Sequence, residues 1–139
     1  MSTDCYSISF GRENARFPFR QSTYKTFIHS VLHELSAKTG THADKLPVHF
    51  VQNKNYIACF YYGGKGNGFN VNTDFLPSLT PRQLREVIIH EFAHYLRNER
   101  FGPTKEKDGH DAKWVAICKE LGIAGDRYHK MHVTQVFDK

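Results

Sequence analysis

Apolar residues recur along the chain with two different spacings, which predict helices and strands. Between residues 22 and 40 they follow a helical repeat, with Ser22 or Thr23 as the N-terminal cap and Gly40 as the stop. The apolar positions of this segment are Tyr24, Phe27, Ile28, Val31, Leu32 and Leu35. We therefore expect an amphipathic helix ahead of the rest of the fold.

Three segments that favour β-structure follow this helix. Val48–Val51 and Tyr56–Tyr62 are predicted strands on either side of a polar Asn53-Lys54-Asn55 turn, and Phe69–Asn72 is a short third strand. The glycine-rich segment 63–68 contains a lysine but lacks the spacing of a phosphate-binding loop. We interpret it as a flexible hairpin connection.

A second helix is predicted by strong terminal signals. Thr80 is a capping residue, Pro81 takes the first helical position, and Gln83 completes a capping box. Gly102-Pro103 ends the helix. Its apolar residues lie on nearly every side, so we expect it to be buried. They are Leu84, Val87, Ile88, Ile89, Phe92 and Leu96.

A polar loop from Arg100 to Asp108 then reverses the chain, and a third helix begins near His110 and closes at Gly122. Its apolar stripe consists of Trp114, Ile117, Cys118 and Leu121. Strands grouped between helices predict an α+β domain with a three- to four-stranded sheet. The fourth strand is expected at about residues 132–137.

Composition is compatible with one intracellular domain. The 139 residues, 40% of them hydrophobic, are enough for one core and too few for two, so we expect a single domain over 1–139 with its core at about 22–122. There is no apolar run of membrane-spanning length and no secretory signal pattern, which favours a cytoplasmic protein without membrane contact. The cysteines, Cys5, Cys59 and Cys118, are odd in number and widely spaced, so neither a disulfide framework nor a metal knuckle is expected.

The segment that indicates chemistry is His90-Glu91-Phe92-Ala93-His94. Positions four apart share one face of a helix, so His90 and His94 can bind one ion. Glu91 then lies beside the metal, where it can act as a general base on a water molecule. The alternative is a pair of core histidines bonded to backbone, with Glu91 in a salt bridge. Because buried polar groups need partners and a metal would satisfy all three, we favour the metal site.

A catalytic zinc usually has three protein ligands, so two histidines leave the site incomplete. The best third candidate is His110, at the start of the helix that we expect to pack against the motif helix. Asp111 could orient a ligand, or it could be a carboxylate that complements the helix dipole. The rival third ligands are Glu106, Glu120, His129 and His132.

Other histidines have ordinary explanations. His29 and His33 are also four apart, but Ser30 stands where a base would be, so we interpret them as surface or core residues. Tyr128, with His129 and His132, could stabilise an oxyanion or could be a polar tail.

These motifs together resemble a known family. Thr80–Leu96, followed by Gly109-His110-x-x-x-Trp114 and Leu121-Gly122, is similar to the SprT-like zinc metallopeptidases, which include the Spartan DNA–protein crosslink proteases. The likeness covers about Ser22 to Gly122 and implies a compact, minigluzincin-like zincin domain. The sequence departs from the family pattern in Asp111, where glycine is frequent, and in lacking the cysteines of a C-terminal zinc ribbon, which weakens any expectation of DNA targeting.

The resemblance also assigns roles to residues. It implies that one Zn²⁺ is held by His90, His94 and His110, with Glu91 as the catalytic base. It further implies that Gly68–Asn72 is an edge strand beside the cleft, along which an extended polypeptide substrate would lie by adding a strand.

The functional hypothesis is therefore a zinc-dependent endopeptidase, with DNA-associated proteins as a substrate class that the resemblance suggests. Zinc would lower the pKa of a bound water to about 7, and Glu91 would take its proton and return it to the leaving amine. The alternative is a non-catalytic or vestigial zinc-binding module that binds nucleic acid or a protein partner. Glu91 counts against it, because a structural site needs no carboxylate there. A metal hydrolase for small substrates is a third hypothesis.

Charge permits weak contact with nucleic acid. The net charge is +5 and the pI is near 9.2, an excess that supports salt-dependent binding at most. Tyr61 and Tyr62 could stack on unpaired bases if they are exposed, as could Phe17 and Phe19. The basic residues considered are Arg12, Arg16, Arg20, Lys25, Lys38, Arg97, Arg100, Lys105 and Lys107.

Overall fold

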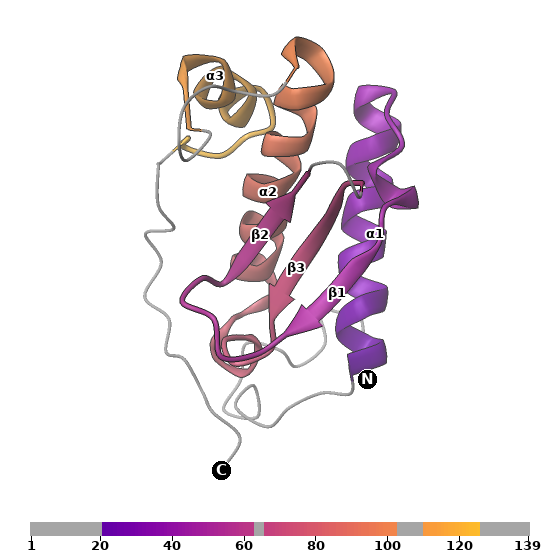
Figure 1. The fold of residues 1–139 in the computed structure, drawn as a ribbon, viewed down its shortest axis with the longest axis vertical. Coiled ribbons are helices and arrows are strands. Elements are labelled where there is room, and N and C mark those ends of the chain that lie inside the picture. Colours follow the sequence, from indigo (N-terminus) through magenta and orange to yellow (C-terminus); the bar gives the residue numbers. More distant parts are fainter. Residues whose placement is uncertain (1–20, 63–65, 103–109, 126–139) are drawn as a thin grey trace.

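The structure is a computed structural model, which describes residues 21–62, 66–102 and 110–125. The described elements are α1 (Gln21–Thr39), β1 (Val48–Val51), β2 (Ala58–Tyr61), β3 (Gly68–Asn72), α2 (Pro81–Phe101) and α3 (Ala112–Glu120), with the short 3₁₀ helices η2 (Ala43–Lys45) and η3 (Leu76–Ser78). Helices α1 and α2 lie side by side behind the sheet, and α3 packs on α2 beyond one end of the strands (Figure 1). The predicted α+β fold is confirmed.

Helix α2 is the central element of this arrangement. It contacts α1, α3 and strand β2, which explains why apolar residues surround it on nearly every side. Phe92 and Val87 are fully buried within a core that draws residues from all three helices and the sheet. The His-Glu-His segment therefore sits in the most enclosed helix of the fold.

The predicted ends of α2 are confirmed in detail. The hydroxyl of Thr80 accepts from the amide of Gln83 at 3.1 Å, and the Gln83 side chain accepts from the amide of Thr80 at 2.9 Å. At the other end Gly102 has a φ of 79°, a backbone conformation that glycine adopts without strain. In α1 the outcome differs slightly, because Ser22 and Thr23 lie inside the helix rather than at its cap.

The sheet is mixed, with strand order β1-β3-β2. Strand β1 runs parallel to β3, with Val48 opposite Phe69, and β2 runs antiparallel to β3, with Phe60 opposite Phe69. The polar turn at Asn53 thus joins two strands that are not neighbours. The predicted hairpin between β2 and β3 is consistent with their antiparallel pairing, although residues 63–65 of the connection lie outside the described residues.

The expectation that Gly68–Asn72 is an edge strand is wrong. Strand β3 lies in the middle of the sheet and is hydrogen-bonded on both sides: the amide of Phe69 donates to Pro47 at 2.9 Å and that of Asn72 donates to Ile57 at 2.8 Å. Its backbone groups are already paired, so it cannot accept a substrate strand. Among the described strands, β2 is the edge that lies against α2.

Strand β2 is also shorter than predicted, beginning at Ala58 rather than Tyr56. The side-chain amide of the fully buried Asn72 donates to the carbonyls of Lys54 and Tyr56, both at 2.9 Å. A side chain therefore takes the place of ladder hydrogen bonds at this point. The closing strand expected at 132–137 lies outside the described residues, and within the described part no helix is long and apolar enough to cross a membrane.

The capping box predicts a defined loss of stability. Thr80→Ala removes the acceptor for the Gln83 amide, so we expect the free energy of unfolding to fall by about 1 kcal/mol in urea denaturation. Thr80→Ser retains the hydroxyl and is the matched control. Equal losses in the two variants would show that the hydroxyl is not what stabilises this helix end.

Candidate metal centre

Three imidazole rings from two segments converge beside the middle of α2. His90 and His94 lie one turn apart on the helix, and His110 precedes Asp111, the residue that caps α3. Each of the three offers a ring nitrogen, and these nitrogens all lie within 4.8 Å of one another. His90 is buried while His94 and His110 are partly exposed, so the cluster opens to solvent on one side.

One separation within this cluster matches the distance between two nitrogen ligands of a zinc ion. Nitrogens held 2.0–2.1 Å from zinc at tetrahedral angles are separated by about 3.3–3.4 Å. The Nε2 atoms of His90 and His110 are 3.2 Å apart, close to that separation. Imidazole is also a ligand type that zinc favours. The convergence supports the metal interpretation over the alternative of two isolated core histidines.

The indole ring of Trp114 forms one wall of the cluster. Its ring centroid lies 4.8 Å from that of His90, 5.1 Å from that of His94 and 4.4 Å from that of His110. The indole is fully buried, and its Nε1 donates to the carbonyl of His90 at 3.5 Å. A large, fixed ring against all three imidazoles restricts where they can lie. The sequence placed Trp114 in an apolar stripe and in the Gly-His-x-x-x-Trp segment of the family resemblance, but its contact with all three imidazoles was not predicted.

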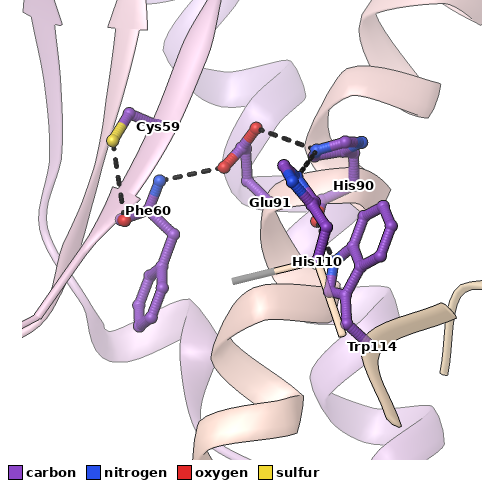
Figure 2. Close-up of polar contacts among 6 residues, drawn as sticks. All are labelled: Cys59, Phe60, His90, Glu91, His110 and Trp114. Atoms are coloured by element: carbon purple, nitrogen blue, oxygen red, sulfur yellow. Dashed lines mark hydrogen bonds and ion pairs between the residues drawn. The ribbon is translucent and has the colours of Figure 1, made fainter. Parts of the chain in front are cut away.

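Glu91 lies between the histidine cluster and the sheet (Figure 2). Its Oε1 accepts a hydrogen bond from the backbone amide of Phe60 in β2 at 2.9 Å. Its Oε2 lies 3.9 Å from His90 Nε2. The carboxylate is thus anchored through one oxygen while the other faces the imidazoles. An acceptor fixed beside a metal position is the arrangement that a general base requires.

Cys59 is close to Glu91 but is not suited to act as a nucleophile. Its thiol donates to the carbonyl of Phe60 at 3.6 Å (Figure 2). Burial raises the pKa of the Cys59 thiol, and the negative charge of Glu91 raises it further. Because the thiolate is the reactive form, this environment keeps the cysteine unreactive.

Asp111 caps α3, one of the two roles considered for it. Its Oδ1 accepts from the amide of Trp114 at 3.0 Å, and its Oδ2 accepts from the guanidinium of Arg97. The Arg97 hydrogen bonds lower the pKa of the Asp111 carboxyl, and the backbone amide of Trp114 lowers it further. The assignment of Arg97 to a basic surface was wrong, because its side chain is buried in this pair.

The rival ligands do not join the cluster where the structure describes them. Glu120 is exposed and forms a two-pronged ion pair with Arg100, with both contacts at 2.9 Å, so Arg100 is also less available to nucleic acid than expected. Glu106, His129 and His132 lie outside the described residues, as does Tyr128.

The second histidine pair has an ordinary role. His33 on α1 contacts Asp44 at 3.0 Å, between its Nδ1 and the carboxylate Oδ2, and its side chain is largely exposed. In the part of the chain that the structure describes, the only group of three potential ligands is His90, His94 and His110. This supports the interpretation of His29 and His33 as ordinary residues.

Comparison with known proteins agrees with this geometry. No curated protein and no solved structure shows significant similarity to the chain. A family model, described as the SprT-like family, matches residues 28–135, which is more than half of the sequence. The matched region contains the three converging histidines and Glu91, and it extends beyond Gly122, where the likeness was expected to end. The chain therefore belongs to the SprT-like family.

Proposed function

We propose that the protein is a zinc-dependent endopeptidase in which His90, His94 and His110 hold the metal and Glu91 is the general base. The observation that carries the proposal is the position of Glu91. Its carboxylate is buried, hydrogen-bonded to Phe60, and directed at the three converging imidazoles. Family membership supports a metallopeptidase-type activity, and the site supplies the residue types that this activity needs.

The ligand count favours a catalytic over a structural site. Structural zinc sites are closed by four protein ligands, whereas catalytic sites keep one position open. Three histidines leave such a position, and the cluster is partly exposed on the side of His94 and His110. A purely structural module would explain the imidazoles but would gain nothing from a buried carboxylate beside them, because burying that group costs free energy.

The chemistry then follows from the chain's own groups. A zinc ion held by His90, His94 and His110 would supply Lewis acidity to the scissile carbonyl and would lower the pKa of a water to about 7. Glu91 accepts the water proton through the oxygen that faces His90, while the Phe60 amide holds the other oxygen in place. The water oxygen would bond to the carbonyl carbon, the C–N bond would break, and Glu91 would return the proton to the departing amine. Trp114 keeps the imidazoles in position during these steps.

The edge of β2 is the surface on which a substrate strand would add. Ile57 pairs with Asn72 of β3, so the alternating residues Ala58 and Phe60 direct their backbone groups away from β3. The hydrogen bond from the Phe60 amide to Glu91 is consistent with this direction. Because that amide is already paired, a substrate strand would pair with the outward backbone groups of Ala58. An extended polypeptide along this edge would lie beside the base. Such binding recognises main chain, so a loose side-chain preference follows.

Replacing the base tests the proposed function directly. We expect Glu91→Gln to reduce zinc-dependent cleavage of an unfolded protein by at least about 100-fold, because the amide cannot accept the proton. Cleavage is followed by gel electrophoresis, with and without single-stranded DNA. Glu99→Gln, an exposed change on the same helix, is the matched control and should retain activity. Equal cleavage by wild type and Glu91→Gln would reject the enzymatic proposal.

Metal binding can be measured without any substrate. We expect one zinc per chain, and His94→Ala should lose it, whereas His33→Ala on α1 should retain it. Trp114 is the only tryptophan in the chain and contacts all three rings, so its fluorescence should report metal addition. Zinc at 1,000 times its Kd should stabilise the fold by about 4 kcal/mol. Retention of zinc by His94→Ala would contradict the ligand set.

A peptide series tests the direction of substrate binding. N-methylation of single backbone amides in a cleaved peptide removes one donor at a time. If the peptide pairs with β2, we expect kcat/KM to fall by about tenfold or more at alternate residues and much less at the residues between them, as strand pairing alternates. A uniform loss at all positions, or none, would argue against strand addition at this edge.

A further inference from the structure

One buried guanidinium contacts both ends of the connection between α2 and α3. Arg97 lies on α2, three residues after His94, and is only 5% exposed. Its Nη1 donates to the carbonyl of Gly102, the residue that caps the end of α2. Its Nε and Nη2 donate to Oδ2 of Asp111 at 3.0 and 2.7 Å. Arg97 therefore joins the residue where the chain leaves α2 to the residue where it enters α3.

Asp111 extends this contact into α3. While Oδ2 accepts both donors from Arg97, Oδ1 accepts from the amide of Trp114 and so caps the helix. One carboxylate thereby fixes the first turn of α3 relative to α2. His110 immediately precedes Asp111, and adjacent Cα atoms are held about 3.8 Å apart by the peptide bond. The backbone of His110 is therefore restrained by the same contact.

Of the three proposed ligands, His110 is the one that needs such restraint. His90 and His94 belong to a single helix, whose repeat sets their separation without further support. His110 approaches from another segment, so its distance from the other two depends on how that segment is held.

We propose that Arg97 and Asp111 are positioning residues that place His110 as the third metal ligand. This inference rests on the proposed function, because it presupposes a metal at the histidine cluster. Interactions one step removed from a metal typically change its affinity by about 10- to 100-fold when they are lost. Loss of this pair leaves all three imidazoles in the chain, but it removes the contact that holds His110 at its position relative to His90 and His94.

The competing explanation is that the pair only stabilises the fold. The Arg97 and Asp111 side chains are 6% and 17% exposed, and removing one partner would leave the other without its opposite charge in a buried position. A second pair makes the two explanations separable. Arg100 and Glu120 also join α2 to α3, but at the far end of α3 and with side chains 38% and 48% exposed. They are matched to Arg97 and Asp111 in chemistry and in the helices they connect.

The test compares zinc affinity and stability in three variants. Arg97→Met removes the guanidinium, and Asp111→Asn keeps a capping acceptor for α3 while removing the charge. Arg100→Met is the control. The zinc Kd is measured by competition with a chromophoric chelator, at a temperature where circular dichroism shows each metal-free variant to be folded. The metal-free melting temperature and the absorption spectrum of the cobalt-substituted protein are recorded in parallel.

We expect Arg97→Met and Asp111→Asn to weaken zinc binding by about 10- to 100-fold and to alter the cobalt spectrum. Arg100→Met should leave both unchanged. A lower melting temperature with an unchanged zinc Kd in Arg97→Met and Asp111→Asn would overturn the inference, as would an equal loss of affinity in Arg100→Met. If Arg97→Met fails to fold, Asp111→Asn decides the matter. A wild-type protein that binds no zinc would overturn the proposed function, and this inference with it.

Discussion

Three imidazoles must meet at one point although only two of them share a helix, and the fold around the site depends on that constraint. Helix α2 supplies His90 and His94 through its own repeat, but the third ring must arrive from the start of α3. The packing of α3 on α2 is therefore part of the site. Trp114 belongs to both, because its indole is buried in the interface and contacts all three imidazoles. The same side chain therefore stabilises the interface between α2 and α3 and restricts the position of the imidazoles.

The buried polar groups of α2 have hydrogen-bond partners on the neighbouring elements, and this is why so enclosed a helix tolerates them. A carboxylate and a guanidinium are buried on it, and each costs free energy unless it is hydrogen-bonded. Glu91 is bonded to the backbone of β2 and Arg97 to Asp111 at the start of α3. Two of the three elements that pack on α2, namely β2 and α3, are thus each held by a polar contact as well as by apolar burial. The first contact orients the proposed base, and the second lies beside the proposed third ligand.

Strand order determines which of the described strands presents its edge beside the site. Because β3 pairs with both β1 and β2, the edge next to α2 belongs to β2 among the described strands. The amide of Phe60, which points outward from that edge, is the group that anchors Glu91. An added substrate strand would therefore run beside the proposed base. The order of the strands therefore determines which backbone groups lie beside the proposed base.

The local sequence was sufficient to predict α2, its capping box and the pairing of His90 with His94, because capping and the four-residue helical spacing depend only on nearby residues. His110 was the best of several candidates for the third ligand, and its approach to the other two depends on the packing of α3 against α2. The family resemblance implied that Gly68–Asn72 is an edge strand, and Arg97 was counted among the basic residues that could contact nucleic acid, but β3 is the central strand and the Arg97 side chain is buried. Strand order and the burial of a charge depend on contacts between residues far apart in the chain. Asp111 shows the division clearly: its place at a helix start is a local signal, whereas its pairing with Arg97 exists only once α3 has packed against α2.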